Sequence, residues 1–280
     1  MNFFLEGWLH PKNLIGLELM RKNGLELDFD FNYYKRYDCI INTTKFKEYL
    51  NYKGKLIYGP HISHPDVNEK FIQKRNNIYF NCLSQWNLEL AKLLIKKEGI
   101  NFVALPFAVD TDKFYPKVKL GKPVIYYKKV DKNRLNDVIS YLKDDFLIFD
   151  YHKGYQENVF KSSISEAPYC IWIGCHESQG FAFQETLSCN TPIFVINVKS
   201  MREESNSAWV NYMPHLELSA TSASYFDDSC GLISYPENWK EDWEIFRNMN
   251  NFKPREFIIN NLSPQACNQI WHDAVDKMLS

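Results

Sequence analysis

The segment that decides the fold runs from Tyr169 to Val195 and reads YCIWIGCHESQGFAFQETLSCNTPIFV. Its apolar start is typical of a buried strand, and Gly180 permits a tight turn. A short helix over residues 181–190 is predicted next, ended by Asn-Thr-Pro before a second apolar run. The order of strand, glycine turn, helix and strand predicts an α/β unit with a parallel sheet.

Two glutamates, Glu177 and Glu185, flank the start of this helix. The free N–H groups and the positive dipole end of a helix favour phosphate, while carboxylates accept hydrogen bonds from sugar hydroxyls. Two glutamates eight positions apart are also common on solvated helices. The strand and the glycine turn before them favour a site for a sugar nucleotide.

Three stretches carry a resemblance to a known family. The segment from Glu177 to Glu185 resembles the Glu-x-x-x-x-x-x-x-Glu motif of retaining glycosyltransferases with the GT-B fold, particularly family 4. Residues 105–116 are similar to that family's passage between domains, where Val-Asp-x-x-x-Phe-x-Pro recurs, although Phe107-Ala108 stands where Asn-Gly is usual. Residues 252–263 resemble the ending of some members. The resemblance spans roughly residue 80 to the C-terminus.

The resemblance implies an α/β chain with two Rossmann-like domains, whose parallel sheets face each other across a cleft. Residues 1–107 would form the acceptor-side domain and residues 108–263 the nucleotide-sugar donor domain. Ser263-Pro264 predicts a helix start, and apolar residues then recur at helical spacing. In this fold the terminal helix, here residues 264–280, would return to the first domain.

The resemblance also assigns roles to the central motif. Glu177 would accept hydrogen bonds from the hydroxyls of the donor sugar, and Glu185 would bind the ribose. The neighbouring donor-binding residues, whose main-chain N–H groups would meet phosphate or sugar oxygens, are Ser178, Gly180, Phe181 and Ala182.

A basic loop follows the predicted strand at residues 123–127. Its cations are Lys128, Lys129, Lys132 and Arg134. The resembled family keeps an Arg and a Lys facing the diphosphate here, so these side chains are predicted to bind the donor. Lysine keeps the charge but lacks the bidentate fork of arginine. The alternative is a solvated basic loop.

One histidine is a further catalytic candidate. His61 follows the predicted strand at residues 55–58, at the carboxyl end where α/β sheets place ligands. It could contact the donor sugar or the leaving phosphate, or serve as a structural histidine. No histidine has the spacing of a charge-relay set with a serine or cysteine.

Strand-like and helix-like runs alternate along the rest of the chain. Further strands are predicted at residues 3–5, 25–31, 39–41, 78–82, 101–105 and 146–149. Further helices are predicted at residues 12–22, 85–97, 131–142 and 156–167. This pattern is typical of parallel α/β domains.

Composition bounds the remaining possibilities. The 280 residues are 45% hydrophobic and carry a formal charge of −1, which gives no global attraction for nucleic acid. The seven cysteines form no zinc-like cluster, and Asp28-Phe29-Asp30 reads as part of an alternating strand rather than a metal site. We expect no metal and no cofactor.

No segment reaches membrane-spanning length, so we expect a cytoplasmic protein, peripheral at a membrane if it contacts one.

The hypothesis is a metal-independent, retaining glycosyltransferase. It would transfer a sugar from a UDP- or GDP-linked donor to a hydroxyl of a glycan, a lipid-linked or a protein acceptor. The alternatives are a catalytically silent sugar-nucleotide-binding protein and a sugar-nucleotide epimerase. A nicotinamide-dependent oxidoreductase is disfavoured because no Gly-x-Gly-x-x-Gly follows an early strand.

Overall fold

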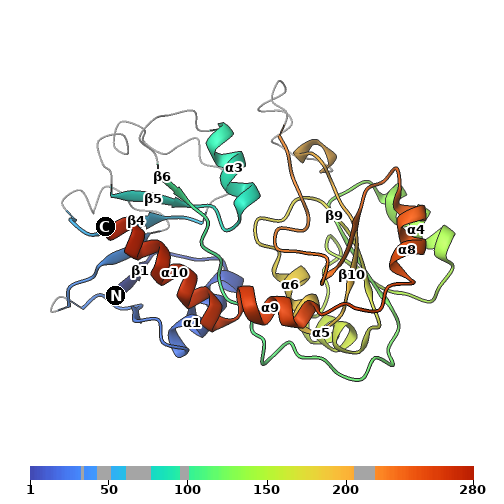
Figure 1. Ribbon diagram of the computed structural model, residues 1–280, viewed down its shortest axis with the longest axis horizontal. Helices are drawn as coiled ribbons and strands as arrows, with labels where there is room; N and C mark the ends of the chain where they lie inside the picture. Colours follow the sequence, from blue (N-terminus) through green and yellow to red (C-terminus); the bar gives the residue numbers. More distant parts are fainter. Residues whose placement is uncertain (33–34, 43–51, 61–76, 95–100, 205–217) are drawn as a thin grey trace. The chain divides into compact units, whose positions relative to one another are not determined.

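A computed structural model describes residues 1–32, 35–42, 52–60, 77–94, 101–204 and 218–280 (Figure 1). The chain divides into two compact units. Unit 1 comprises Met1–Ala108 and Leu262–Ser280, and unit 2 comprises Val109–Asn261. The first unit therefore contains both ends of the chain.

Unit 1 is built on a six-stranded sheet whose strands all pair in parallel. The strand order is β2-β1-β3-β4-β5-β6. The strands are β1 (Phe3–Glu6), β2 (Leu27–Asp28), β3 (Cys39–Asn42), β4 (Lys55–Tyr58), β5 (Ile78–Asn81) and β6 (Asn101–Val103). The helices are α1 (Pro11–Lys22), α3 (Gln85–Leu94) and the terminal α10 (Pro264–Leu279).

The terminal helix α10 belongs to the core of unit 1. The side chain of Ser263 accepts a hydrogen bond from the Ala266 N–H, and Pro264 occupies the first turn, as the sequence predicts. The Trp271 ring is fully buried and packs against Phe3, and its Nε1 donates to the Pro106 carbonyl at 2.8 Å. Figure 1 shows α10 running beside α1.

Unit 2 is built on a five-stranded parallel sheet with the order β11-β10-β9-β7-β8. Its strands are β7 (Val124–Lys128), β8 (Leu147–Asp150), β9 (Cys170–Gly174), β10 (Ile193–Ile196) and β11 (Gly231–Ser234). Its helices are α4 (Lys132–Leu142), α5 (Glu157–Glu166), α6 (Phe181–Ser188), α8 (Trp239–Phe246) and α9 (Pro254–Leu262, ending in unit 1), with the 3-10 turn η2 (Met201–Glu203).

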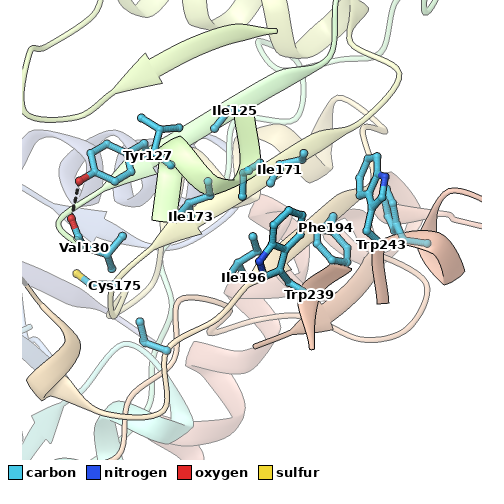
Figure 2. Close-up of a cluster of buried hydrophobic side chains, with 14 residues drawn as sticks. Ile125, Tyr127, Val130, Ile171, Ile173, Cys175, Phe194, Ile196, Trp239 and Trp243 are labelled. Atoms are coloured by element: carbon cyan, nitrogen blue, oxygen red, sulfur yellow. Dashed lines mark hydrogen bonds between the residues drawn. The ribbon is translucent and has the colours of Figure 1, made fainter. Parts of the chain in front are cut away.

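The two faces of this sheet bury different side chains. On one face, Ile125 and Ile173 of the sheet pack with Trp239 and Trp243 of α8 and with side chains of α4 (Figure 2). On the other face, the Trp172 ring stacks on Tyr126 at 4.0 Å, with α5 and α6 beyond it. The alternation of β-strand side chains thus sandwiches the sheet between two helical layers.

The predicted α/β class with parallel sheets is confirmed, and one predicted strand is shorter than expected. The alternating run at residues 25–31 contributes only Leu27–Asp28 to the sheet, and beyond β2 the Phe31 ring packs on Phe4 at 5.2 Å. The strand β11 and the helices α8 and α9 are present although none of them was predicted. In α8, residues Trp239, Trp243 and Phe246 recur at helical spacing, so the signal was available in the sequence.

Candidate functional site

The strand order of unit 2 reverses between β7 and β9. From β7 the chain moves outward to β8, and it then crosses back to place β9 on the other side of β7. In open parallel sheets, ligands bind beyond the carboxyl ends of the strands at such a switch point. Lys128 ends β7, and Glu177 lies three residues beyond β9.

Lys128 and Glu177 meet at this point. The Lys128 Nζ lies 2.7 Å from the Glu177 Oε1, and both side chains are mostly buried, at 15% and 12% exposure. The ammonium also lies 4.5 Å from the centroid of the Tyr151 ring, from the loop after β8. The structure therefore brings together a cation and a carboxylate that the sequence places 49 residues apart.

The main chain around Glu177 is held from the loop before β11. The Glu177 N–H donates to the Thr221 carbonyl at 3.0 Å, and the Ser224 hydroxyl donates to the Glu177 carbonyl. Asn197 fixes this loop in turn, because its Oδ1 accepts from the N–H and the hydroxyl of Ser222. The carboxylate is thus presented from a backbone that is hydrogen-bonded on both sides.

Gly180 starts the helix α6 in the left-handed region, with φ of +84°. A Cβ at this position would lie 3.3 Å from the Glu177 Cβ, so the turn is tight as well as left-handed. Gly180, as the N-cap residue, offers no side-chain cap to the helix, which begins at Phe181 and Ala182 beside the half-buried Ser178. The start of α6 therefore lies close to Glu177, and the first N–H groups of a helix favour an anion.

Glu185 lies one turn further into α6 and is buried, at 4% exposure. Tyr155 lies in the loop after β8, and its hydroxyl is hydrogen-bonded to the Tyr126 hydroxyl at 3.2 Å. Burial raises the pKa of Tyr155 to about 12, and the charges of Glu185 and Glu177 act in the same direction. Tyr155 therefore stays protonated at neutral pH, within electrostatic reach of both glutamates.

Two of the other predicted cations form ion pairs with Glu203, the last residue of η2, and with Glu204, which follows it. The Lys129 Nζ lies 2.9 Å from the Glu204 Oε1, and the Arg134 Nη2 lies 2.6 Å from the Glu203 Oε2. Lys132, by contrast, is exposed at the start of α4 and has no described contact with these groups. Lys128 and Lys129 thus lie around His176, Arg134 is held by the residue before Glu204, and Lys132 is apart.

Two sets of site residues were not singled out from the sequence. Glu203 is the last residue of a Ser-x-x-Glu capping box that begins at Ser200, and Glu204 follows it. That motif is recognisable without a structure. Tyr151 and Tyr155 follow the carboxyl end of β8, where ligand-facing loops are expected.

One histidine was predicted for the site, and another lies beside Glu177. His61 lies outside the described residues. His176 lies beside Glu177, with its Nδ1 3.2 Å from the Glu204 Oε2. Burial lowers the pKa of His176, against the opposing charges of Glu204 and Glu177, so the imidazole is neutral at physiological pH.

Within the described ranges, one group has the composition of a metal site, and it consists of Cys175, His176 and Glu204. The Lys129 ammonium already lies against Glu204, and burial raises the pKa of the Cys175 thiol to about 12. A metal ion would have to displace the lysine and deprotonate the thiol. These residues therefore fit an internal ion-pair network better than a metal centre.

Among the described helices, none has the length and apolarity needed to cross a membrane.

The two α/β units, each built on a parallel sheet, have the GT-B fold. Solved structures with a similar fold include sucrose-phosphate synthase from Thermosynechococcus elongatus, with a TM-score of 0.52, 10% identity, and coverage of 87% of this chain and 74% of that one. WaaG, a glycosyltransferase involved in lipopolysaccharide biosynthesis, gives a TM-score of 0.51 at 9% identity and covers 99% of both chains. TarM gives 0.52 at 13% identity, over 85% of this chain and 54% of that one.

These identities show a shared fold, and the chain spans little more than half the length of TarM. No protein-family model matches the sequence, and no curated protein matches it.

Proposed function

We propose that this protein is a glycosyltransferase that moves a sugar from a nucleotide-sugar donor to a hydroxyl group of an acceptor. The observation that carries the proposal is the Lys128–Glu177 pair at the switch point of unit 2. It stands beside the start of α6 at Gly180, where the helix N–H groups would attract an anion and Glu177 would accept from a hydroxyl group. The GT-B fold shared with WaaG supports this proposal.

The residues have distinct parts in the proposed donor site. Glu177 accepts hydrogen bonds from the sugar hydroxyls, while Lys128 and the first N–H groups of α6 face the diphosphate. Glu185, buried one turn into α6, binds the ribose hydroxyls. Lys129 and Arg134 add positive charge at the phosphates.

The proposed reaction breaks the bond between the anomeric carbon and the diphosphate oxygen. The electron pair leaves with the nucleoside diphosphate, whose developing charge the cations and N–H groups stabilise without a metal. The acceptor oxygen bonds to the anomeric carbon on the same face, and its proton passes to the departing phosphate. The anomeric configuration is then retained.

A thermal-shift comparison of UDP- and GDP-linked sugars tests the donor site. A ligand that binds only the folded state stabilises it by about 2.7 kcal/mol at a concentration 100 times its Kd. We expect at least one of these donors to raise the melting temperature at millimolar concentration. The variant Glu185→Gln should need more donor for the same shift, while Glu166→Gln, on the exposed end of α5, should match the wild type.

If no sugar nucleotide shifts the melting temperature, the proposed donor site is wrong. A shift without any sugar transfer to water or acceptor would instead identify a silent binding protein. Conversion of the donor sugar without an acceptor would identify an epimerase.

A further inference from the structure

Two cations of the site are held by carboxylates from one short segment. Glu203 ends η2 and binds Arg134, and the next residue, Glu204, binds Lys129. With the Lys128–Glu177 pair, each of the three cations is already matched by a carboxylate. A phosphate that enters this group has to exchange with a carboxylate rather than fill an open positive pocket.

Glu203 is hydrogen-bonded independently of Arg134. Its Oε1 accepts from the backbone N–H of Lys199 at 2.6 Å and from that of Ser200 at 3.1 Å. The Ser200 Oγ accepts from the Arg202 N–H, which completes the capping box. Glu203 therefore keeps two donors when Arg134 leaves it, and the cost of the exchange is small.

The guanidinium of Arg134 is only partly used by Glu203. The Nη2 makes the 2.6 Å contact, whereas the buried Nη1 has no hydrogen-bond partner among the described residues. A phosphate group can accept from both arms of a guanidinium. The side chain is 24% exposed but its Nη1 is covered, so a phosphate that binds both arms has to draw the guanidinium away from Glu203.

Lys129 has a similar freedom to change partners. Its backbone is left-handed, with φ of +58°, a conformation that costs free energy for a residue other than glycine and is frequent at functional sites. Its side chain is 35% exposed, whereas Glu204 is 9% exposed and also faces the His176 Nδ1. Lys129 can therefore swing to a ligand while Glu204 stays beside the imidazole.

We infer that Glu203 and Glu204 compete with ligand phosphate for Arg134 and Lys129, and so set the affinity of the site for a nucleoside diphosphate. The inference rests on the proposed function, because it takes the ligand to be the diphosphate of a sugar nucleotide. Each carboxylate occupies a cation in the ligand-free chain. Removing its charge leaves the cation free for phosphate and removes a repulsion from the bound state.

Isothermal titration calorimetry with UDP and with GDP tests this competition. Glu203→Gln keeps the capping box, because a glutamine oxygen can accept the same backbone N–H groups. We expect Glu203→Gln and Glu204→Gln each to lower the Kd by about fivefold or more for the nucleotide that the protein binds. The matched control Glu166→Gln removes a carboxylate from the exposed Lys117–Glu166 pair and should leave the Kd unchanged.

The outcomes separate the inference from the function on which it rests. Tighter binding in the Glu203 or Glu204 variant, with an unchanged control, supports competition. An unchanged or larger Kd in both variants overturns it and makes these glutamates supports that orient the cations. If neither nucleotide binds any of the four forms at millimolar concentration, the proposed function falls and the inference falls with it.

Discussion

The Lys128–Glu177 ion pair is costly for a fold to maintain. Moving two charges out of water carries a desolvation penalty that their attraction often fails to recover, and well-packed apolar side chains are frequently as stable. Both side chains are mostly buried, at a strand end where apolar residues could pack. A pair of this kind at a topological switch point is therefore better explained by a ligand than by stability.

The protonation of His176, beside this pair, makes the free energy of unfolding depend on pH. Burial holds its pKa below the usual value of 6.5, which the histidine keeps in the unfolded chain, while Glu204 and Glu177 oppose the shift and Lys129 and Lys128 reinforce it. Below about pH 6.5 the unfolded chain therefore binds a proton that the folded chain resists, and the free energy of unfolding falls as the pH falls.

We expect His176→Asn to show a weaker loss of stability on acidification than the wild type. Urea unfolding at pH 7.5, 6.5 and 5.5 measures this difference. Identical pH dependence in the two proteins would show that His176 does not carry the effect.

Single residues were predictable from the sequence where a strand end or a helix start marked them. Glu177, Gly180 and Lys128 follow from that rule, and the fold brings them to one edge of the sheet. The partners of the cations were not predictable in this way. Glu203 and Glu204 lie about 70 residues from Arg134 and Lys129 in the sequence. They meet these cations only because β10, which precedes them, joins the same sheet as β7.

At the scale of elements, the short helix α6 is fixed from its far end. Arg255, in the first turn of α9, donates from Nη1 to the carbonyls of Ser188 at 2.8 Å and Phe114 at 3.1 Å. Its Nη2 donates to the Thr111 carbonyl at 3.2 Å. One guanidinium thus joins α9, the end of α6 and the segment that opens unit 2.

We expect Arg255→Ala to destabilise unit 2 by about 3 kcal/mol, because three carbonyls lose a charged donor in a partly buried place. Arg247→Ala is the matched control. Arg247 pairs with Glu244 on the exposed face of α8, and such pairs contribute about 0–1 kcal/mol. Denaturant unfolding compares the two, and equal losses would refute an anchoring role for Arg255.

Elements were predictable where periodicity and caps agreed. The Asp131 side chain caps α4 at the Asn133 N–H, and Ser263 caps α10, as their sequences indicate. β11 was harder to foresee because its four residues start at Gly231, whose φ is +148°. A Cβ there would lie 2.0 Å from the Ile193 carbonyl oxygen, so close pairing with β10 rather than strand propensity explains the glycine.

The whole molecule consists of two α/β units with parallel sheets, and both chain ends belong to unit 1. The side chain amide of Asn268 in α10 donates to the carbonyls of Met20 and Asn23 at the end of α1. These hydrogen bonds and the buried Trp271 attach α10 to the start of unit 1, more than 240 positions away in the sequence. The residues of the proposed donor site that the structure describes all lie in unit 2.

Release of UDP or GDP from a sugar nucleotide, compared between the wild type and Glu177→Gln, shows whether the proposed donor site supports sugar transfer. The glutamine keeps the shape of the side chain but removes the charge that faces Lys128. We predict that the wild type releases the nucleotide and that the variant, assayed at a temperature where circular dichroism shows it folded, is slower by about 100-fold or more. Equal rates in the two proteins, or no release by the wild type from any UDP- or GDP-linked sugar, would contradict the account.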